Sequence, residues 1–173
     1  MFQVNASVAA EFAGVRLTIA AIGRLKDGAE RVLVDRYIER LAGARGVGIV
    51  GIAEKELNES RLGSSAERRA DEAARLLKAA DGADLLVALD ESGRAMSSDS
   101  FARWLGARRD GGTRHAAFLI GGADGHGDAI AARAQYTLSL GPMTLPHGIA
   151  RAVVAEQLYR ATTILAGHPY HRA

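Results

Sequence analysis

The chain has 173 residues with a formal net charge of +2, and 48% of its residues are hydrophobic. This length suits one domain with a single substantial core, and the apolar content excludes an intrinsically disordered chain. The sequence contains no cysteine, which excludes a disulfide framework and thiolate metal sites or nucleophiles and favours a reducing, cytoplasmic location.

The first 14 residues precede the first predicted strand. They include small and apolar residues but no basic start, and Glu11 lies among them, so the segment is a poor signal peptide. No run in the chain approaches the roughly 18 apolar residues that a membrane span needs. We expect residues 1–14 to be a disordered leader, residues 15–173 to form one domain, and no membrane to be involved.

Apolar stretches bounded by turn residues predict five β-strands. Their near-continuous runs of Val, Ile, Leu and Ala are typical of strands that are buried on both faces. In chain order the predicted strands are 15–23, 47–54, 84–93, 115–122 and 136–140. The third is expected to run into a turn over "DESG".

Segments with helical spacing of apolar residues follow each of these strands. The predicted helices are 28–43, 64–82, 98–112, 127–135 and 146–167. Ser64, followed three residues later by Glu67, is typical of a capping box at a helix start. Alternation of strands and helices predicts an α/β fold with a parallel sheet covered by helices on both faces.

Three loops that follow strands could carry chemistry, because ligands of such sheets bind beyond the carboxyl ends of the strands. They are 89–97, 120–128 and 140–148. The second loop contains four glycines, but its spacing is not G-x-G-x-x-G, it follows the fourth strand and it lacks a Walker lysine. A dinucleotide or P-loop site is therefore disfavoured, and a turn that needs several glycines explains the loop equally well.

The third loop holds Pro142 and Pro146. Proline fixes φ, so this loop is expected to be stiff while its other backbone groups remain free to meet a ligand such as an adenine edge. A tight turn before a helix is an equally good reading. The amides expected to be free are those of Leu140, Met143, Thr144 and Leu145.

The end of the chain gathers His168, Pro169, Tyr170, His171 and Arg172. The two histidines are three residues apart, but the proline between them breaks a helix and no nearby carboxylate completes a ligand shell, so we expect no metal. Either the tail is packed and inert, or it brings an imidazole, an aromatic face and a guanidinium to a nucleotide substrate.

Several of these segments together resemble one known family. "AAIGRLK", "LIGGADG", "MTLPHGIARAVVAEQLYRA" and the terminal "HPYHR" are similar to the ribosomal RNA large subunit methyltransferase H family of SPOUT-class enzymes. The resemblance runs from about Val15 to the end of the chain. It implies a parallel α/β sheet with a deep C-terminal trefoil knot, which is a rare exception to unknotted folding, and a homodimer.

The resemblance also implies an activity and a site. Such enzymes transfer a methyl group from S-adenosylmethionine, without a metal, to N3 of a pseudouridine in 23S rRNA of the large ribosomal subunit. By position, Tyr170 and His171 would orient the flipped base, Arg172 would contact phosphate, and His171 is the candidate base. The implied cofactor-binding positions are Leu89, Gly121, Leu140, Gly141, Pro142, Met143, Thr144 and Leu145.

Other readings remain open from the sequence. Arg151 and Arg160 in the last helix could be solvated or could face RNA. A Rossmann-type enzyme would need its glycine motif after the first strand, where "AAIGRLKDG" is a poor match. A non-catalytic ribosome- or RNA-binding protein, or a methyltransferase that acts on another RNA, would share many of the same features.

Overall fold

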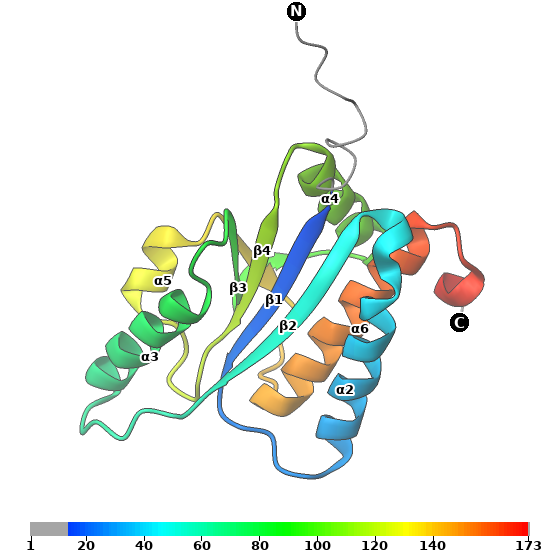
Figure 1. Ribbon diagram of the computed structural model, residues 1–173. Coiled ribbons are helices and arrows are strands. Elements are labelled where there is room, and N and C mark those ends of the chain that lie inside the picture. Colours follow the sequence, from blue (N-terminus) through cyan, green and yellow to red (C-terminus); the bar gives the residue numbers. More distant parts are fainter. Residues whose placement is uncertain (1–13, 173) are drawn as a thin grey trace, which may run out of the picture.

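The computed structural model describes residues 14–172, with the side chains of Arg45, His171 and Arg172 left out. The predicted leader therefore lies almost entirely outside the described residues. Five strands form one sheet in the order β2-β1-β4-β3-β5, and every pair is parallel (Figure 1). The strands are β1 (Val15–Ile22), β2 (Ile49–Leu57), β3 (Leu85–Ala95), β4 (His115–Ile120) and β5 (Tyr136–Ser139).

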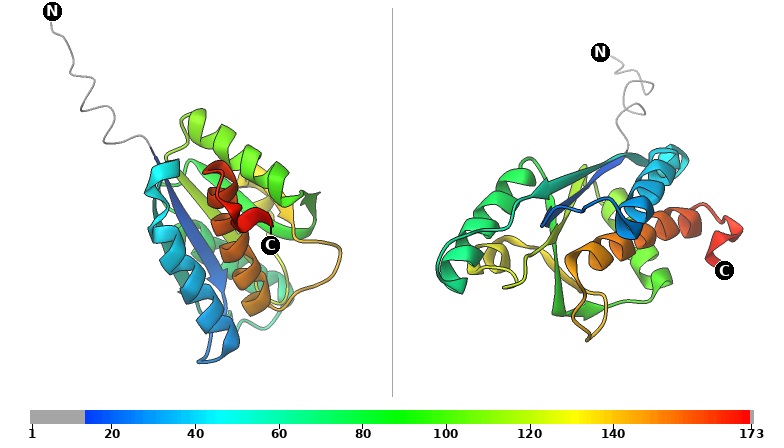
Figure 2. Two further views of the ribbon diagram at one scale, coloured as in Figure 1. Left: turned by 90° about the vertical axis from the view of Figure 1, so that its right-hand side faces the viewer. Right: turned by 90° about the horizontal axis from the view of Figure 1, so that it is seen from below.

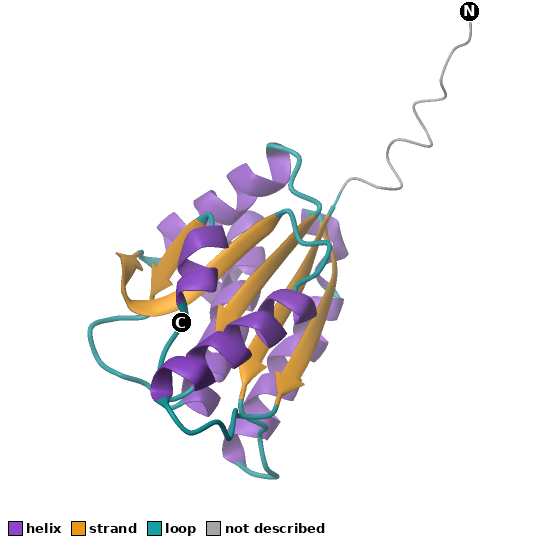
Figure 3. Cartoon of the chain, turned by 90° about the vertical axis from the view of Figure 1, so that its left-hand side faces the viewer, coloured by secondary structure: helices purple, strands orange, loops and turns teal. Residues whose placement is uncertain are grey.

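Helices cover both faces of this sheet, as the sequence predicts. Helices α2, α4 and α6 pack on one face of the sheet, and α3 and α5 pack on the other (Figures 1 and 2). The face covered by α3 and α5 is turned toward the viewer in Figure 3. No helix of the described chain combines the length and apolar character needed to cross a bilayer. The helices are α2 (Ala29–Ala42), α3 (Ser65–Ala79), α4 (Ser98–Asp110), α5 (Asp128–Arg133) and α6 (His147–Leu165), with 3-10 turns η1 (Ala44–Val47) and η2 (Pro169–Arg172).

The core has two halves because successive strand residues point to opposite faces of the sheet. In β1, Leu17 and Ile19 belong to the apolar cluster on the α6 side, whereas Ala20 and Ile22 belong to the cluster on the α3 side. All four are fully buried. This two-sided burial explains why the strands lack polar alternation, and it confirms the prediction of a sheet covered on both faces.

β2 continues through Leu57, three residues beyond its predicted end. The sequence underestimates it because Glu54, Lys55 and Glu56 look unsuited to a strand. Each is satisfied by a partner outside β2: Lys55 Nζ donates to the carbonyl of Ala79 at 2.6 Å, and both glutamates pair with arginines. Tertiary partners therefore override the local preference.

The turn expected at the end of β3 is an irregularity within a longer strand. Pairing with β5 shifts register between Leu89 and Arg94 and then resumes through Ala95. Gly93 permits this, because a Cβ there would lie 2.8 Å from the backbone of Thr137.

The predicted capping box at the start of α3 is confirmed. Ser64 Oγ accepts from the Glu67 amide at 3.2 Å, and the Glu67 carboxylate accepts from the Ser64 amide at 3.0 Å. The helix ends at Ala79, so Gly82, with φ of +78°, lies in the following loop rather than at the helix end. The trefoil knot stays a prediction from the family resemblance.

Candidate functional site

The three loops singled out in the sequence meet at one cavity of about 770 Å³. Because all five strands run in the same direction, β3, β4 and β5 deliver their carboxyl ends to a single edge of the sheet. The cavity lies at this edge, the position expected of ligand sites in parallel sheets. Its walls are formed by residues 89–92, 120–126, 140–141 and 143–147, together with Glu59 and Ala150.

Seven of the eight implied cofactor-binding residues line this cavity. The exception is Pro142, which is exposed beside it. The cavity volume falls within the range of about 300–1,000 Å³ that is usual for sites of small organic ligands. The lining residues are Leu89, Gly121, Leu140, Gly141, Met143, Thr144 and Leu145.

The loop before α6 presents free backbone groups to the cavity. The amides of Met143, Thr144 and Leu145 form no hydrogen bond with the described residues, as expected for a stiff loop with proline at both ends. Met143 is 79% exposed, and Gly141 has φ of +126°, a conformation that other residues rarely adopt. Thr144 Oγ1 donates to the Glu91 carboxylate at 3.0 Å, which ties this wall to the end of β3.

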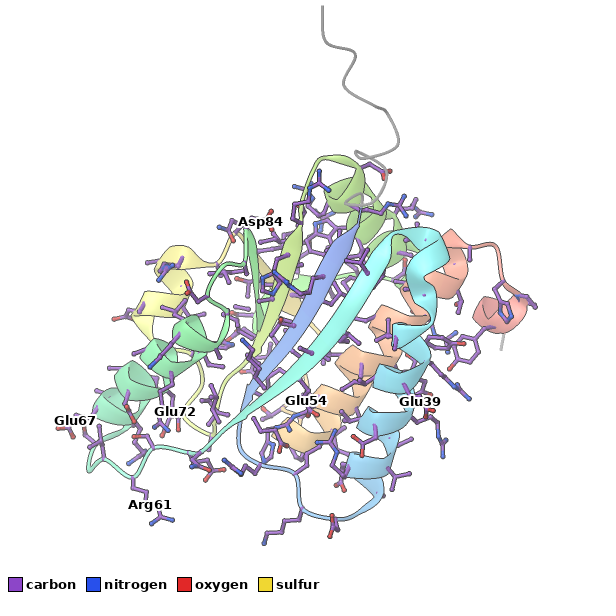
Figure 4. All side chains as sticks on the ribbon, in the orientation of Figure 1. Glu39, Glu54, Arg61, Glu67, Glu72 and Asp84 are labelled. Atoms are coloured by element: carbon purple, nitrogen blue, oxygen red, sulfur yellow. The ribbon has the colours of Figure 1, made fainter. Side chains whose placement is uncertain are left out.

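The glycine loop after β4 is held against α3. Arg68 donates two hydrogen bonds to Asp124, at 2.6 and 3.1 Å. The buried Glu72, a residue of α3 labelled in Figure 4, lies directly behind Gly122, because a Cβ on that glycine would be 2.6 Å from Glu72 Oε2. A side chain at this position would therefore displace the wall of the cavity.

His126 joins two walls of the cavity. Its Nε2–H donates to the carbonyl of Leu89 at 3.0 Å, so the glycine loop is fastened to the end of β3. Burial lowers the pKa of His126 below the ordinary value of 6.5, and the ring is therefore neutral at pH 7. The sequence offered one signal for this residue, a histidine placed between two glycines of a candidate loop.

Arg151 is neither solvated nor directed at RNA, so both sequence readings of it are wrong. Its side chain is fully buried, and its Nη1 donates to Glu54 at 2.9 Å and to Glu56 at 2.5 Å (Figure 4 labels Glu54). Burial alone would raise the pKa of Glu56, but the Leu25 amide and the Arg151 guanidinium hold it below its usual value. Helical spacing could not reveal this, because the two carboxylates come from β2.

Arg160 is partly solvated, with a side chain 20% exposed, and pairs with Glu156 at 2.8 Å. Tyr170 lies in the same region. Its ring packs on Tyr159 with centroids 5.0 Å apart, and its hydroxyl is 3.4 Å from that of Tyr37. Burial raises the pKa of Tyr170 to about 12, so this phenol stays protonated at neutral pH.

The tail and the cavity are therefore separated within one chain. The Tyr170 hydroxyl contacts Glu156 of α6. Glu156 lies two and a half helical turns, or roughly 14 Å along the helix axis, from His147, the α6 residue at the cavity. The structure does not bring Tyr170 together with the cofactor-binding residues. For His171 and Arg172 it describes the backbone in η2 and no side chain.

Among residues 14–172, no group of three or more His, Asp or Glu side chains is arranged to hold a metal ion. No sequence pattern assigned a role to His147, Asp90 or Glu91. All three line the cavity.

Comparisons with known proteins agree over nearly the whole chain. A family model described as a predicted SPOUT methyltransferase matches residues 15–171. A protein of Sinorhizobium fredii named ribosomal RNA large subunit methyltransferase H is 51% identical over 160 residues, covering 92% of this chain and 100% of the relative. The protein of the same name from Brucella anthropi is 48% identical, with the same coverage.

Among solved structures, the SpoU methyltransferase AviRb from Streptomyces viridochromogenes, in complex with AdoMet, matches with a TM-score of 0.41 and 14% identity. The match covers 90% of this chain and 62% of that one. The family assignment depends instead on the family model and the close relatives. On that evidence, the chain belongs to the ribosomal RNA large subunit methyltransferase H family of SPOUT methyltransferases.

Proposed function

We propose that this protein transfers a methyl group from S-adenosylmethionine to N3 of a pseudouridine in 23S rRNA of the large ribosomal subunit. The observation that carries the proposal is the convergence of seven implied cofactor-binding residues on one cavity. The names of the close relatives support large-subunit rRNA as the substrate. A ribosomal substrate also supports the cytoplasmic location expected from the lack of cysteine.

The cavity suits the cofactor in size and in chemistry. The free amides of Met143, Thr144 and Leu145 can donate to the adenine edge, and the apolar side chains of Leu89 and Leu140 can cover its faces. When bound, S-adenosylmethionine supplies an electrophilic methyl group on a positively charged sulfur. Because the glycine loop and the loop before α6 are both fastened to the end of β3, the protein can hold the reacting groups in line for a displacement.

Methyl transfer also requires the loss of a proton. The electron pair of N3 forms the new N–C bond, the electron pair of the broken C–S bond goes to sulfur, and the N3 proton must pass to a base. His171 is the proposed base. Tyr170 is unsuited to that task because its phenol stays protonated, so it is proposed to orient the flipped base, with Arg172 contacting phosphate.

We propose that the tail acts in a homodimer. Tyr170 is held against α6 well away from the cavity of its own chain, so a tail that takes part in catalysis must serve the cavity of a second copy. A dimer would also hold the tail in place without a separate RNA-binding domain. The partner copy thus supplies part of each site.

The test measures transfer of labelled methyl from S-adenosylmethionine to assembled ribosomes and to free 23S rRNA, both lacking the mark at the target. The full chain is compared with a chain truncated after Gly167 and with H171A. Labelling of 23S rRNA by the full chain, with normal cofactor affinity but no labelling by the truncated chain, supports the proposal. H171A should lose turnover and keep cofactor affinity.

Other results of the same test would favour the alternatives. Labelling of a different RNA would reassign the substrate, and cofactor binding by all forms without any labelling would remove the proposed reaction. A full chain that binds ribosomes but not the cofactor would indicate a non-catalytic RNA-binding protein.

A further inference from the structure

His147 is a chemically capable residue of the cavity to which the proposed reaction gives no role. It is the first residue of α6, it is partly exposed and it lines the cavity beside Pro146. The residues around it determine which of its two ring nitrogens can donate a hydrogen bond to a ligand in the cavity.

Arg151 fixes the hydrogen-bonding role of one ring nitrogen. Its Nη2 lies 3.4 Å from His147 Nδ1. A guanidinium can only donate hydrogen bonds, so Nδ1 must accept, and the neutral ring then carries its proton on Nε2. One turn of α6 separates the two residues, which places them on the same face of the helix.

The guanidinium is itself held on several sides. Nη1 pairs with Glu54 and Glu56, and Nη2 donates to the carbonyl of Gly23 at 2.7 Å. A fully buried arginine with three such partners cannot swing away without giving up its bonds to Glu54, to Glu56 and to the Gly23 carbonyl. The position of the donor to Nδ1 is therefore set by the sheet and not by solvent.

Gly23 restricts the ring from the other side. A Cβ at this position would lie 2.7 Å from both Cε1 and Nε2 of His147, so the imidazole packs directly on the glycine backbone. Gly23 has φ of +93°, and its amide donates to the Leu57 carbonyl at 2.8 Å. The imidazole is thus clamped between a fixed loop and a fixed arginine.

Nε2 is the atom left available. It has no hydrogen-bond partner among the described residues, and it is not one of the buried polar atoms that lack a partner. A donor that is oriented, accessible and unpaired therefore stands in the wall of the cavity.

We infer that His147 donates a hydrogen bond from Nε2 to a ring carbonyl of the target pyrimidine, and that Arg151 is the residue that positions it. This inference rests on the proposed function. When N3 gives up its proton, negative charge spreads to the two carbonyl oxygens that flank it. A fixed donor at one of these oxygens stabilises that charge, which disappears once the methyl group is on N3, so the bond is strongest where it aids the reaction.

The test compares H147Q, H147N and H147A in the full chain. The amide nitrogen of glutamine reaches the position of Nε2, whereas that of asparagine reaches only the position of Nδ1. Loss of the donor in H147A and H147N should slow single-turnover methyl transfer to ribosomes by about 100-fold. H147Q should remain within about tenfold of the unmodified chain, and all three should bind S-adenosylmethionine with nearly unchanged affinity.

The inference is overturned if H147A transfers methyl at close to the normal rate, if glutamine is no better than asparagine, or if the variants lose cofactor affinity in parallel with rate. The last result would make the ring a structural element of the cavity. If the unmodified chain labels no RNA at all, the proposed function fails. This result differs from a failure of the His147 inference, in which the unmodified chain is active.

Nitrogen-15 NMR of labelled histidine tests the role of Arg151 independently of any substrate, with H147Q identifying the signal. The free protein should show the Nε2–H tautomer with a hydrogen-bonded Nδ1. R151K keeps the positive charge but loses the planar guanidinium that donates in several directions at once, so His147 in this variant should show a mixture of tautomers. An Nδ1–H tautomer in the unmodified chain, or an unchanged tautomer in folded R151K, contradicts the assignment.

Discussion

At the scale of single residues, two arginines of one helix have opposite environments. Arg151 is fully buried and pairs with carboxylates of β2, whereas Arg160 is partly exposed and pairs with Glu156 one turn away on α6 itself. Removing Arg151 takes a hydrogen-bond donor from the partly buried Glu54 and Glu56, which keep Arg31 as a second partner, while a surface pair is worth little because water replaces it.

We therefore expect R151M to lower the free energy of unfolding by about 1–3 kcal/mol, the cost of lost donors to partly buried acceptors, and R160M, its matched control, to lower it by less than about 1 kcal/mol. Urea denaturation followed by circular dichroism measures both. Equal losses in the two variants would show that burial of Arg151 does not decide its contribution.

A buried histidine, His115, and a partly buried one, His126, make stability depend on pH. Burial lowers the pKa of His115 and of His126 below 6.5. In the unfolded chain these rings take up protons near pH 6.5, whereas in the folded chain they resist until lower pH. Their contribution to stability is therefore complete above pH 6.5 and declines as pH falls toward the folded-state pKa.

The expected loss is at most about 1.4 kcal/mol per pH unit for each histidine, measured as the free energy of unfolding between pH 8 and pH 5.5. H126Q should make this curve flatter, because it removes one of the two rings whose pKa is lowered on folding. A curve that keeps its slope in H126Q would assign the effect to other groups.

At the scale of elements, the capping box of α3 is a local feature with a local cost. S64A removes the acceptor of the Glu67 amide and should destabilise the protein by about 1 kcal/mol. S65A is the control, because Ser65 is exposed and already inside the helix. Thermal unfolding of both variants checks the difference, and a similar change in each would mean that the cap contributes nothing beyond helix propensity.

Most elements were predictable because their signals are local. Apolar runs identified all five strands, and Ser64 with Glu67 marked the start of α3. The end of β2 and the continuation of β3 were not predictable, because Glu54 and Glu56 depend on Arg151, nearly 100 residues away, and Gly93 depends on the approach of Thr137. The position of the cavity walls was predictable, because the loops after parallel strands meet at one edge of the sheet. The burial of Arg151 was not predictable from the sequence.

At the scale of the whole molecule, the separation of the tail from the cavity leads to a prediction about dimers that contain two different variants. A chain truncated after Gly167 keeps its cavity but has no tail, and H147A keeps its tail but has an impaired cavity. If the tail serves the cavity of the partner, refolding the two inactive chains together should produce dimers with one complete site.

Labelled methyl transfer to ribosomes, measured before and after mixing, checks this. We expect activity to appear in the mixture, up to about a quarter of that of the unmodified protein for random pairing of identical subunits. Each variant refolded alone is the control, and a mixture of H147A with H171A should recover activity to a similar extent, because the intact cavity of H171A would receive the intact tail of H147A. A mixture that stays inactive while mixed dimers form would mean that the tail acts within its own chain.

The arrangement of the sheet also decides when the protein can fold. β1 lies between β2 and β4, and the cluster on its α6 side draws on residues from Val15 to Ala161. Contacts between such distant parts of a chain form slowly, because a long loop must close before they are gained. During synthesis, the face of β1 toward α6 must therefore wait for nearly the entire chain, and a protein proposed to modify ribosomes completes its core only as its own ribosome finishes translating it.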